Sequence, residues 1–298
     1  MKTALRLSER FDPTLVGKDG VFQRLDSSAA DQPGALIYAA QVNFLNAGLA
    51  NENVSAFLVP PDLEERVKAA GKSYVVSPTP RLEFFRLYQQ LHVEGWLEPE
   101  WEPSMGVDCR IHPDATVSPK VRLGDRVVIE AGARIGDHCV IGDDAYIGQN
   151  AVIGADGLMP VIDEEGNALR FSHAGSVLLG DRVVVLAGTC IVKSVFGRPT
   201  TIGSDSYVGL LTNIGHDVSI GRRCVVGGNC VLAGASVLED GAEVWASTSV
   251  AQGTRIKAGA KIHMGSVVVQ TVEAGEAVSG NYAYNHRKRA LDHLRKTK

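Results

Sequence analysis

The chain has 298 residues, of which 45% are hydrophobic and 21% charged, a composition typical of a globular protein. Its net charge of -4 argues against nucleic-acid binding, because neutralising phosphates takes a basic face. No stretch approaches the roughly 18 apolar residues of a membrane span, and the first residues lack the apolar run of a signal peptide. We therefore expect a cytoplasmic protein that binds no nucleic acid and does not span a membrane.

Cysteines occur at positions 109, 139, 190, 224 and 230. Their number is odd and no two of them have C-x-x-C spacing, which argues against a disulfide framework and against a thiolate zinc site. We expect them to be reduced residues that serve in packing.

Residues 1–103 show no internal repeat and mix two kinds of segment. Short apolar runs at 34–40, 55–60 and 73–77 are typical of strands, and the segments 61–71 and 81–92 have helical character. We predict a small α/β domain over residues 1–103, which ends in a Pro- and Glu-rich linker near 96–104.

A repeat of six residues begins after this linker. Every sixth residue from Ile111 to Ile153 is aliphatic, a second series runs from Ile202 to Val268, and a short block at 179–191 lies between them. Glycine often follows the aliphatic residue, and the fourth residue after it is usually small or β-branched. Such a period fits neither an α-helix nor a long strand, and it is the mark of a hexapeptide parallel β-helix.

In this fold each hexapeptide forms one face of a triangular coil, and three hexapeptides complete a turn of about eighteen residues. The aliphatic residue points inward and glycine permits the tight corner. Solenoids built from this motif are left-handed, an exception to the usual crossover rule. We predict a mainly β fold, with a left-handed β-helix of about seven to eight coils over 104–273 and with Cys139, Cys224 and Cys230 in its interior. A β-sandwich with glycine turns would not keep the six-residue series for so long.

Two insertions interrupt the repeat, at 155–177 and at 192–201. Inserted residues must leave a solenoid as loops, and long loops in compact domains are usually functional or disordered. Both insertions precede the coil that carries His216, and we therefore expect them to serve the function of that coil.

The repeat decays after Val268, and we predict a basic helix within residues 274–298. Asn285 is its expected N-cap, and Ala290, Leu291 and Leu294 form one stripe. From His286 onward the chain has six Lys or Arg residues and one Asp.

These three parts together resemble the UDP-3-O-(3-hydroxyacyl)glucosamine N-acyltransferases of lipid A biosynthesis. The resemblance covers nearly the whole chain and includes "GALIYAAQVNFLNAGLANENVSAFLVPPDL" (34–63), "IGADGLMPVIDEEGNALRFSHAGSVLLGDRV" (153–183), "NIGHDVSIG" (213–221) and "VSGNYAYNHRKR" (278–289). The resemblance implies an acyltransferase that uses a phosphopantetheine thioester, from acyl-carrier protein or acyl-CoA, and holds no tightly bound cofactor.

The resemblance also implies a site for the uracil of the sugar nucleotide in the N-terminal domain. The family's aromatic, Asn and aromatic positions correspond here to Tyr38, Gln41 and Phe44. The two rings can stack on a base, but Gln in place of Asn leaves the identity of the base open. Alternatively, Tyr38 and Phe44 are core residues of a small domain.

His216, in the "IGH" step, corresponds to the family's general base. An amine that attacks a thioester must lose a proton, and a neutral imidazole can accept it. Gly234 lies eighteen residues further on, about 5 Å higher in the stack, and its N–H can donate to the developing oxyanion. The family's oxyanion donor has the same offset. The alternative is a surface histidine at a coil corner.

Two departures from the family leave the sugar and the acyl group open. The family's Thr-Ile-Asp-Arg-Gly sequence is replaced by Cys190-Ile191-Val192-Lys193-Ser194, and a second family histidine corresponds to Gly253. A paralogue that acylates another nucleotide-linked amino sugar from CoA, for O-antigen or another surface polysaccharide, therefore stays open.

Two other classes of protein are alternatives to an acyltransferase. A zinc enzyme on the same solenoid needs three histidines around one metal, whereas the later coils offer only His216 and His263, and we predict no metal site. A purely structural solenoid needs neither insertions nor the histidine.

The class of hexapeptide acyltransferases further implies a homotrimer with active sites between neighbouring β-helices. The basic tail fits acidic acyl-carrier protein or the CoA phosphates. A solvated helix face is the alternative for the tail.

Overall fold

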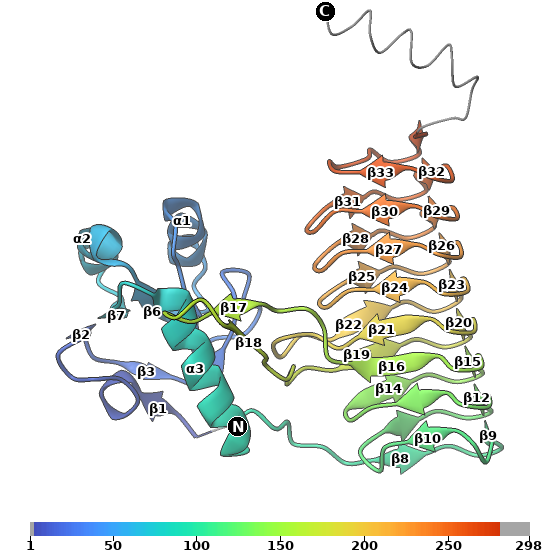
Figure 1. Ribbon diagram of the computed structural model, residues 1–298, viewed down its shortest axis with the longest axis horizontal. Helices are drawn as coiled ribbons and strands as arrows, with labels where there is room; N and C mark the ends of the chain where they lie inside the picture. Colours follow the sequence, from blue (N-terminus) through green and yellow to red (C-terminus); the bar gives the residue numbers. More distant parts are fainter. Residues whose placement is uncertain (1–2, 281–298) are drawn as a thin grey trace, which may run out of the picture. The chain divides into compact units, whose positions relative to one another are not determined.

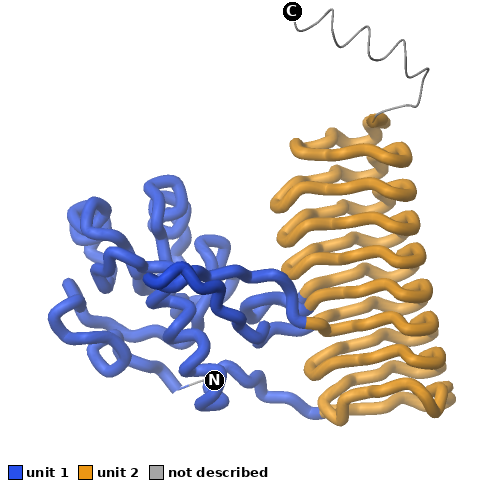
Figure 2. The backbone as a smooth tube through the Cα atoms, viewed as in Figure 1, with its two compact units in different colours: residues 1–102, 156–176, 193–199 blue, residues 103–155, 177–192, 200–298 orange. Residues whose placement is uncertain are grey.

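The structure is a computed structural model that describes residues 3–280, and these residues form two compact units (Figure 2). Within the described residues, unit 1 comprises the chain up to Glu102 together with 156–176 and 193–199. Unit 2 comprises 103–155, 177–192 and the residues from Thr200 onward. The predicted basic helix, with Asn285, Ala290, Leu291 and Leu294, lies outside the described residues.

Unit 2 is a left-handed parallel β-helix, which confirms the predicted fold class (Figure 1). Its three faces are parallel sheets of short strands that pair with the strand one coil away. The first face contains β8 (Ser104–Met105), β11 (Arg122–Leu123), β14 (Cys139–Ile141), β19 (Val177–Leu179), β22 (Thr200–Ile202), β25 (Ser219–Ile220), β28 (Val237–Leu238) and β31 (Arg255–Ile256).

The other two faces have the same construction. The second face contains β9 (Arg110–Ile111), β12 (Val128–Ile129), β15 (Tyr146–Ile147), β20 (Val184–Val185), β23 (Tyr207–Val208), β26 (Val225–Val226), β29 (Glu243–Val244), β32 (Lys261–Ile262) and β34 (Ala277–Val278). The third face contains β10 (Thr116–Val117), β13 (Arg134–Ile135), β16 (Val152–Ala155), β21 (Cys190–Val192), β24 (Asn213–Ile214), β27 (Val231–Leu232), β30 (Ser249–Val250) and β33 (Val267–Val268). Because β34 pairs with β32, the β-helix continues past the predicted end at residue 273.

The aliphatic series fills the interior of the β-helix in one continuous core from Val121 to Val272. Cys139, Cys224 and Cys230 are buried in it, as predicted for the small interior positions. Each inward residue stacks on its equivalent one coil away, as Ile153 does on Ile191. The six-residue period therefore determines which residues touch, because neighbours in space are one coil apart in sequence.

The chain turns from the first face to the second at what we call the first corner, where side chains bond neighbouring coils together. The Asp125 N–H donates to Asp143 Oδ1 (2.9 Å), and the Asp143 N–H donates to Asp181 Oδ1 (3.0 Å). Asp125 in turn accepts from the Val107 N–H, and Asp240 accepts from the Arg222 N–H. These carboxylates satisfy turn N–H groups that no strand partner can reach.

In the coils from Asp108 to Arg223, the next residue of each first-corner turn lies in the left-handed region, with φ between 53° and 63°. The charge at this position alternates along the stack, in the order Asp108, Arg126, Asp144, Arg182, Asp205 and Arg223. Arg126 binds Asp144 through two hydrogen bonds (2.7 and 2.8 Å), and Arg182 binds Asp205 in the same way (2.6 and 3.1 Å). The Arg182 guanidinium lowers the pKa of the Asp205 carboxyl.

Unit 1 contains the predicted α/β domain, built on a five-stranded sheet. Its strands lie in the order β2 (Val16–Lys18), β7 (Ser73–Val76), β6 (Val54–Val59), β5 (Ala35–Tyr38) and β4 (Arg24–Leu25), with only β2 antiparallel to its neighbour. The helices are α1 (Val42–Ala50), α2 (Glu64–Ala69) and α3 (Pro80–Val93), with short turns η1 (Leu7–Glu9) and η2 (Pro61–Leu63). An antiparallel pair of strands, β1 (Leu5–Arg6) and β3 (Val21–Phe22), completes the N-terminal part. The three predicted strands and two predicted helices are present, and α1 was not predicted.

Side-chain packing shows how the helices cover this sheet. Phe84, Phe85 and Leu91 of α3 are buried in one cluster with Leu36 and Leu58 of the sheet. Leu45 of α1 and Val67 of α2 belong to a separate cluster with Ile37, Phe57 and Val59. Since Leu36 and Ile37 alternate along β5, α3 covers one face of the sheet and α1 and α2 cover the other.

Both insertions belong to unit 1, whereas the sequence prediction had kept them within the β-helix domain. The first contains a hairpin of β17 (Val161–Ile162) and β18 (Ala168–Leu169), and Arg86 of α3 binds Glu164 through two hydrogen bonds (2.9 and 2.7 Å). The Tyr88 hydroxyl accepts from the Ala174 N–H (2.6 Å) and donates to the Val195 carbonyl (2.8 Å). Tyr88 therefore joins α3 to both insertions.

Candidate active site

His216 lies at the third corner of the β-helix, where the chain turns from the third face to the first. It follows β24 and precedes β25, and with Asp217 it forms the turn between them. Asp217 has a φ of 59°, a left-handed conformation that Asp tolerates better than most residues. The repeat thus places two polar side chains at a corner, side by side in sequence.

His216 and Asp217 form a hydrogen-bonded pair. His216 Nδ1 lies 2.7 Å from Asp217 Oδ2, and the two side chains are 16% and 24% exposed. A carboxylate on Nδ1 favours the tautomer that carries its proton there, which makes Nε2 the basic nitrogen. The arrangement matches what a general base needs. Sequence reasoning missed Asp217, although its place directly after the histidine is a usable signal.

Gly234 lies against the His216 ring. A Cβ added at Gly234 would be 2.6 Å from both Cε1 and Nε2 of His216, so that a side chain at this position would force the ring to move. The two coils are bonded directly, because the Ala235 N–H donates to the His216 carbonyl (2.8 Å). The structure therefore brings the predicted catalytic residues together, and the glycine makes room for the ring.

Gly253 and the starts of both insertions lie along the third corner. Gly253 lies two coils above the His216–Asp217 pair, has a φ of 68°, and donates its N–H to the Gly234 carbonyl (3.1 Å). The chain also leaves the β-helix at this corner for both insertions, after β16 and after β21. Since β16, β21 and β24 are neighbours in the third face, the two exits and His216 lie along one corner in consecutive coils.

Within unit 1, Asp156, His173 and Lys193 link the bases of the two insertions. Lys193 forms an ion pair with Asp156, with Nζ 3.5 Å from Oδ1. The His173 N–H donates to the same carboxylate (3.0 Å), and His173 Nδ1 lies 3.0 Å from the Lys193 carbonyl oxygen. Burial of Asp156 opposes its ionisation, but the His173 N–H and the Lys193 charge together lower the pKa of this carboxyl.

The three residues predicted to bind the base occupy the end of β5 and the start of α1. The Tyr38 ring packs on Phe84 and Phe85, with centroids 5.2 and 6.0 Å apart, and is partly buried. Gln41 is the exposed N-cap residue of α1, and Phe44 in the first turn is 50% exposed. In the described residues no ring contact joins Tyr38 to Phe44. Tyr38 thus packs against the core of unit 1, whereas Phe44 is half-exposed.

Comparison with known proteins bears on the repeat region. The model of the bacterial transferase hexapeptide family, which describes six repeats, matches residues 123–155 and 199–234. Among solved structures, the UDP-N-acetylglucosamine acyltransferase of Arabidopsis is similar, with 27% identity, a TM-score of 0.54, and coverage of 64% of this chain and 67% of that chain. The repeat domain is that of a hexapeptide-repeat acyltransferase.

Two further solved structures match the acyltransferase at lower similarity. The UDP-N-acetylglucosamine acyltransferase of Francisella novicida is 23% identical, over 62% of this chain and 71% of that chain, with a TM-score of 0.39. The UDP-N-acetylglucosamine acyltransferase of Bacteroides fragilis is 20% identical, over 62% of this chain and 76% of that chain, with a TM-score of 0.44. Each match covers less than two thirds of this chain. No curated protein sequence matches the chain.

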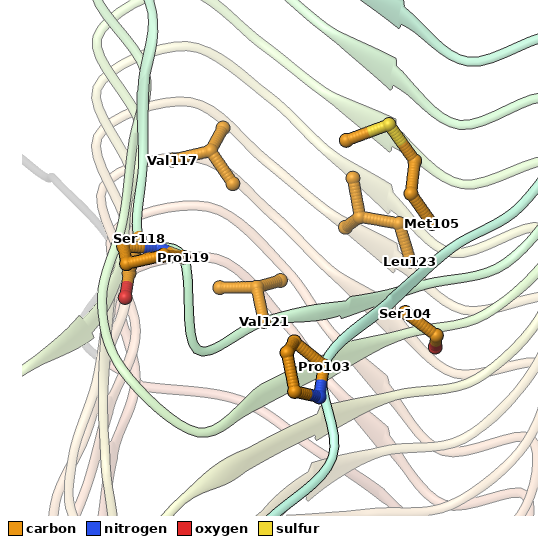
Figure 3. A pocket seen from close by; sticks show the side chains of 8 residues that line it. All are labelled: Pro103, Ser104, Met105, Val117, Ser118, Pro119, Val121 and Leu123. Carbon is orange, nitrogen blue, oxygen red and sulfur yellow. The ribbon is translucent and has the colours of Figure 1, made fainter.

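A cavity of about 360 Å³ opens at the first coil of the acyltransferase (Figure 3). It is lined by Pro103, Ser104, Met105, Val117, Ser118, Pro119, Val121 and Leu123. In the third face, β13, β16 and β21 separate β10 at this cavity from β24 beside His216. The cavity is therefore the open end of the β-helix interior, and the His216–Asp217 pair does not line it.

Among residues 3–280, no three His, Cys, Asp or Glu side chains lie together in a way that could hold a metal ion. The α-helices of this part of the chain have 9, 6 and 14 residues, and none could reach across a bilayer.

Proposed function

We propose that the protein is an N-acyltransferase that moves a 3-hydroxyacyl group from a phosphopantetheine thioester to the amine of a UDP-3-O-acylglucosamine-like sugar nucleotide, as in lipid A biosynthesis. The observation that carries the proposal is the His216–Asp217 pair, which lies on Gly234 at one corner of an acyltransferase β-helix. The similar Arabidopsis enzyme is named for a UDP-linked amino sugar, which supports an acceptor of this class.

In the proposed reaction the sugar amine attacks the thioester carbonyl carbon. His216 Nε2 takes the proton that the nitrogen loses as the C–N bond forms, and Asp217 stabilises the resulting imidazolium through Nδ1–H. The Gly234 N–H donates to the oxyanion of the tetrahedral intermediate. Collapse of the intermediate breaks the C–S bond, and the leaving thiolate takes the proton from the imidazolium. The products are an amide and a free phosphopantetheine thiol.

A second candidate is a CoA-dependent N-acyltransferase that acts on another nucleotide-linked amino sugar. Glycine at position 253 and the Val192-Lys193 pair favour it, because both depart from the family pattern. A panel of acyl-carrier-protein and CoA thioesters, each tested with UDP-3-O-acylglucosamine and with free nucleotide amino sugars, separates the two by product mass. Treatment with hydroxylamine distinguishes amides, which resist it, from esters. Absence of acyl transfer to any amino sugar contradicts both candidates.

The proposal assigns Tyr38, Gln41 and Phe44 of unit 1 to the nucleotide base. Replacing Phe44 by Ala should raise KM for the sugar nucleotide with less effect on kcat, as expected where substrate and transition state are bound equally. The half-exposed Phe44 ring is the sharper test, because Tyr38 also packs in the core. If neither Phe44→Ala nor Tyr38→Ala changes KM, unit 1 does not bind the base.

Assembly and partners complete the proposal. In line with the class, whose active sites lie between neighbouring β-helices, we place the active site in a homotrimer, which should sediment at three times 31.8 kDa. A fully active monomer contradicts this assignment. The basic sequence from His286 onward, outside the described residues, fits an acidic acyl-carrier protein. All five cysteines are free thiols, which fits the cytoplasm.

A further inference from the structure

A group of buried hydroxyls in the β-helix interior bonds neighbouring coils together. Thr189 donates to the Gly209 carbonyl (2.6 Å), Ser206 to the Gly221 carbonyl (2.8 Å), and Thr212 to the Gly227 carbonyl (2.8 Å). These side chains are at most 1% exposed. Each hydroxyl also accepts a backbone N–H from a neighbouring coil, of Thr212, Cys224 and Cys230 respectively. None of these partners belongs to the candidate site, so these hydrogen bonds serve the stacking of the coils.

Thr200 belongs to the same group but has a different partner. It is fully buried at the start of β22, and its Oγ1 accepts a hydrogen bond from the Asp217 N–H (2.9 Å). Asp217 is the residue whose carboxylate lies 2.7 Å from His216 Nδ1. One buried hydroxyl thus holds the backbone of the residue that orients the candidate base.

The second insertion explains why a side chain, instead of a backbone carbonyl, accepts the hydrogen bond from the Asp217 N–H. In the two coils above, the N–H groups equivalent to that of Asp217 donate to a backbone carbonyl one coil below. The Ala235 N–H donates to the His216 carbonyl, and the Gly253 N–H donates to the Gly234 carbonyl. In the coil below Asp217 the chain leaves the β-helix after Val192 and returns at Thr200, so no turn of the β-helix lies there. The Thr200 hydroxyl replaces the missing carbonyl, and a buried N–H that lost it would be left unsatisfied.

We propose that Thr200 is a positioning residue for acyl transfer, which acts through Asp217 on the orientation of the His216 ring. The inference rests on the proposed function, because it takes His216 as the general base. Without the hydroxyl, the strained Asp217 peptide loses its anchor and the carboxylate no longer holds Nδ1 in place. A displacement of this kind lowers the rate of the chemical step and leaves the binding of substrates intact.

The test compares Thr200→Val with Thr200→Ser and with the control Thr189→Val. Thr189 is equally buried and its hydroxyl also bonds a neighbouring coil, but its partners are Gly209 and Thr212. We expect Thr200→Val to lower kcat by about ten- to a hundredfold at unchanged KM. Thr200→Ser should keep most of the wild-type kcat, and Thr189→Val should lose thermal stability without losing kcat. If the valine variant does not fold, Thr200→Ala supplies the same comparison.

A double-mutant cycle with Asp217→Asn checks the route of the effect. If Thr200 acts through Asp217, Thr200→Val should cost little further kcat in the Asp217→Asn background. Full additivity, an unchanged kcat in Thr200→Val, or an equal loss in Thr189→Val overturns the inference. These outcomes differ from failure of the proposed function, in which His216→Ala itself keeps its turnover.

Discussion

The first and third corners of the β-helix are built from the same hexapeptides but use their side chains differently. At the first corner Asp125, Asp143 and Asp181 bond the backbone of neighbouring coils, and arginines pair with aspartates from coil to coil. At the third corner His216 instead pairs with the adjacent Asp217. The comparison teaches that a solenoid can place stabilising hydrogen bonds and ion pairs at one corner and candidate catalytic side chains at another.

The largest effect should come from the third corner. His216→Ala should lower kcat by roughly 10²–10⁴ with KM and thermal stability nearly unchanged, because the ring is needed only when the amine loses its proton. Steady-state kinetics and a thermal melt measure both properties. The matched first-corner variant, Asp143→Ala, should do the opposite, losing about 1 kcal/mol of stability with kcat unchanged. Near-normal turnover in His216→Ala would remove the distinction between the corners.

Gly234→Ala should have the next largest effect on catalysis. The added Cβ would lie 2.6 Å from two ring atoms of His216, so that the ring must move, and we expect kcat to fall about tenfold or more. The control is Gly197→Ala, where an added Cβ meets nothing within 4 Å. Equal kinetic effects of the two substitutions would mean that the position of the ring does not matter.

The smallest effect concerns an ion pair of the first corner and depends on pH. The Arg182 side chain lowers the pKa of Asp205 below its ordinary value of 3.8. A carboxyl with a lowered pKa stabilises the fold above its unfolded-state pKa, and the gain disappears as pH falls through the folded-state pKa. Asp205→Asn should therefore lower Tm slightly at pH 7, with a difference from wild type that shrinks below about pH 4. A difference independent of pH contradicts this account, and kcat should not change.

The β-helix could be predicted almost residue by residue, and unit 1 could not. Period six places each neighbour one coil away, so that the buried cysteines and the closeness of His216 and Gly234 follow from counting. The contacts of unit 1 have no such period. Its strands and two of its helices were visible, but not that Tyr88 would join both insertions to α3.

Two features of the candidate site could not be predicted from the sequence either. Asp217 follows His216 directly, but only its left-handed turn brings the carboxylate to Nδ1. Thr200 occupies an interior position like many others, and its partner depends on where the chain re-enters the β-helix. In both cases the deciding factor is the path of the backbone at an interruption, where the period no longer applies.

The most direct test of the account is the pH dependence of kcat in wild type and His216→Ala, measured with saturating thioester and amino-sugar substrates. If the imidazole accepts the proton of the amine, the wild-type rate should fall on the acid side as His216 becomes protonated. The slow residual reaction of His216→Ala should lack that acid limb. An identical acid limb in the mutant would mean that another group is the base and that the His216–Asp217 pair is a feature of the corner alone.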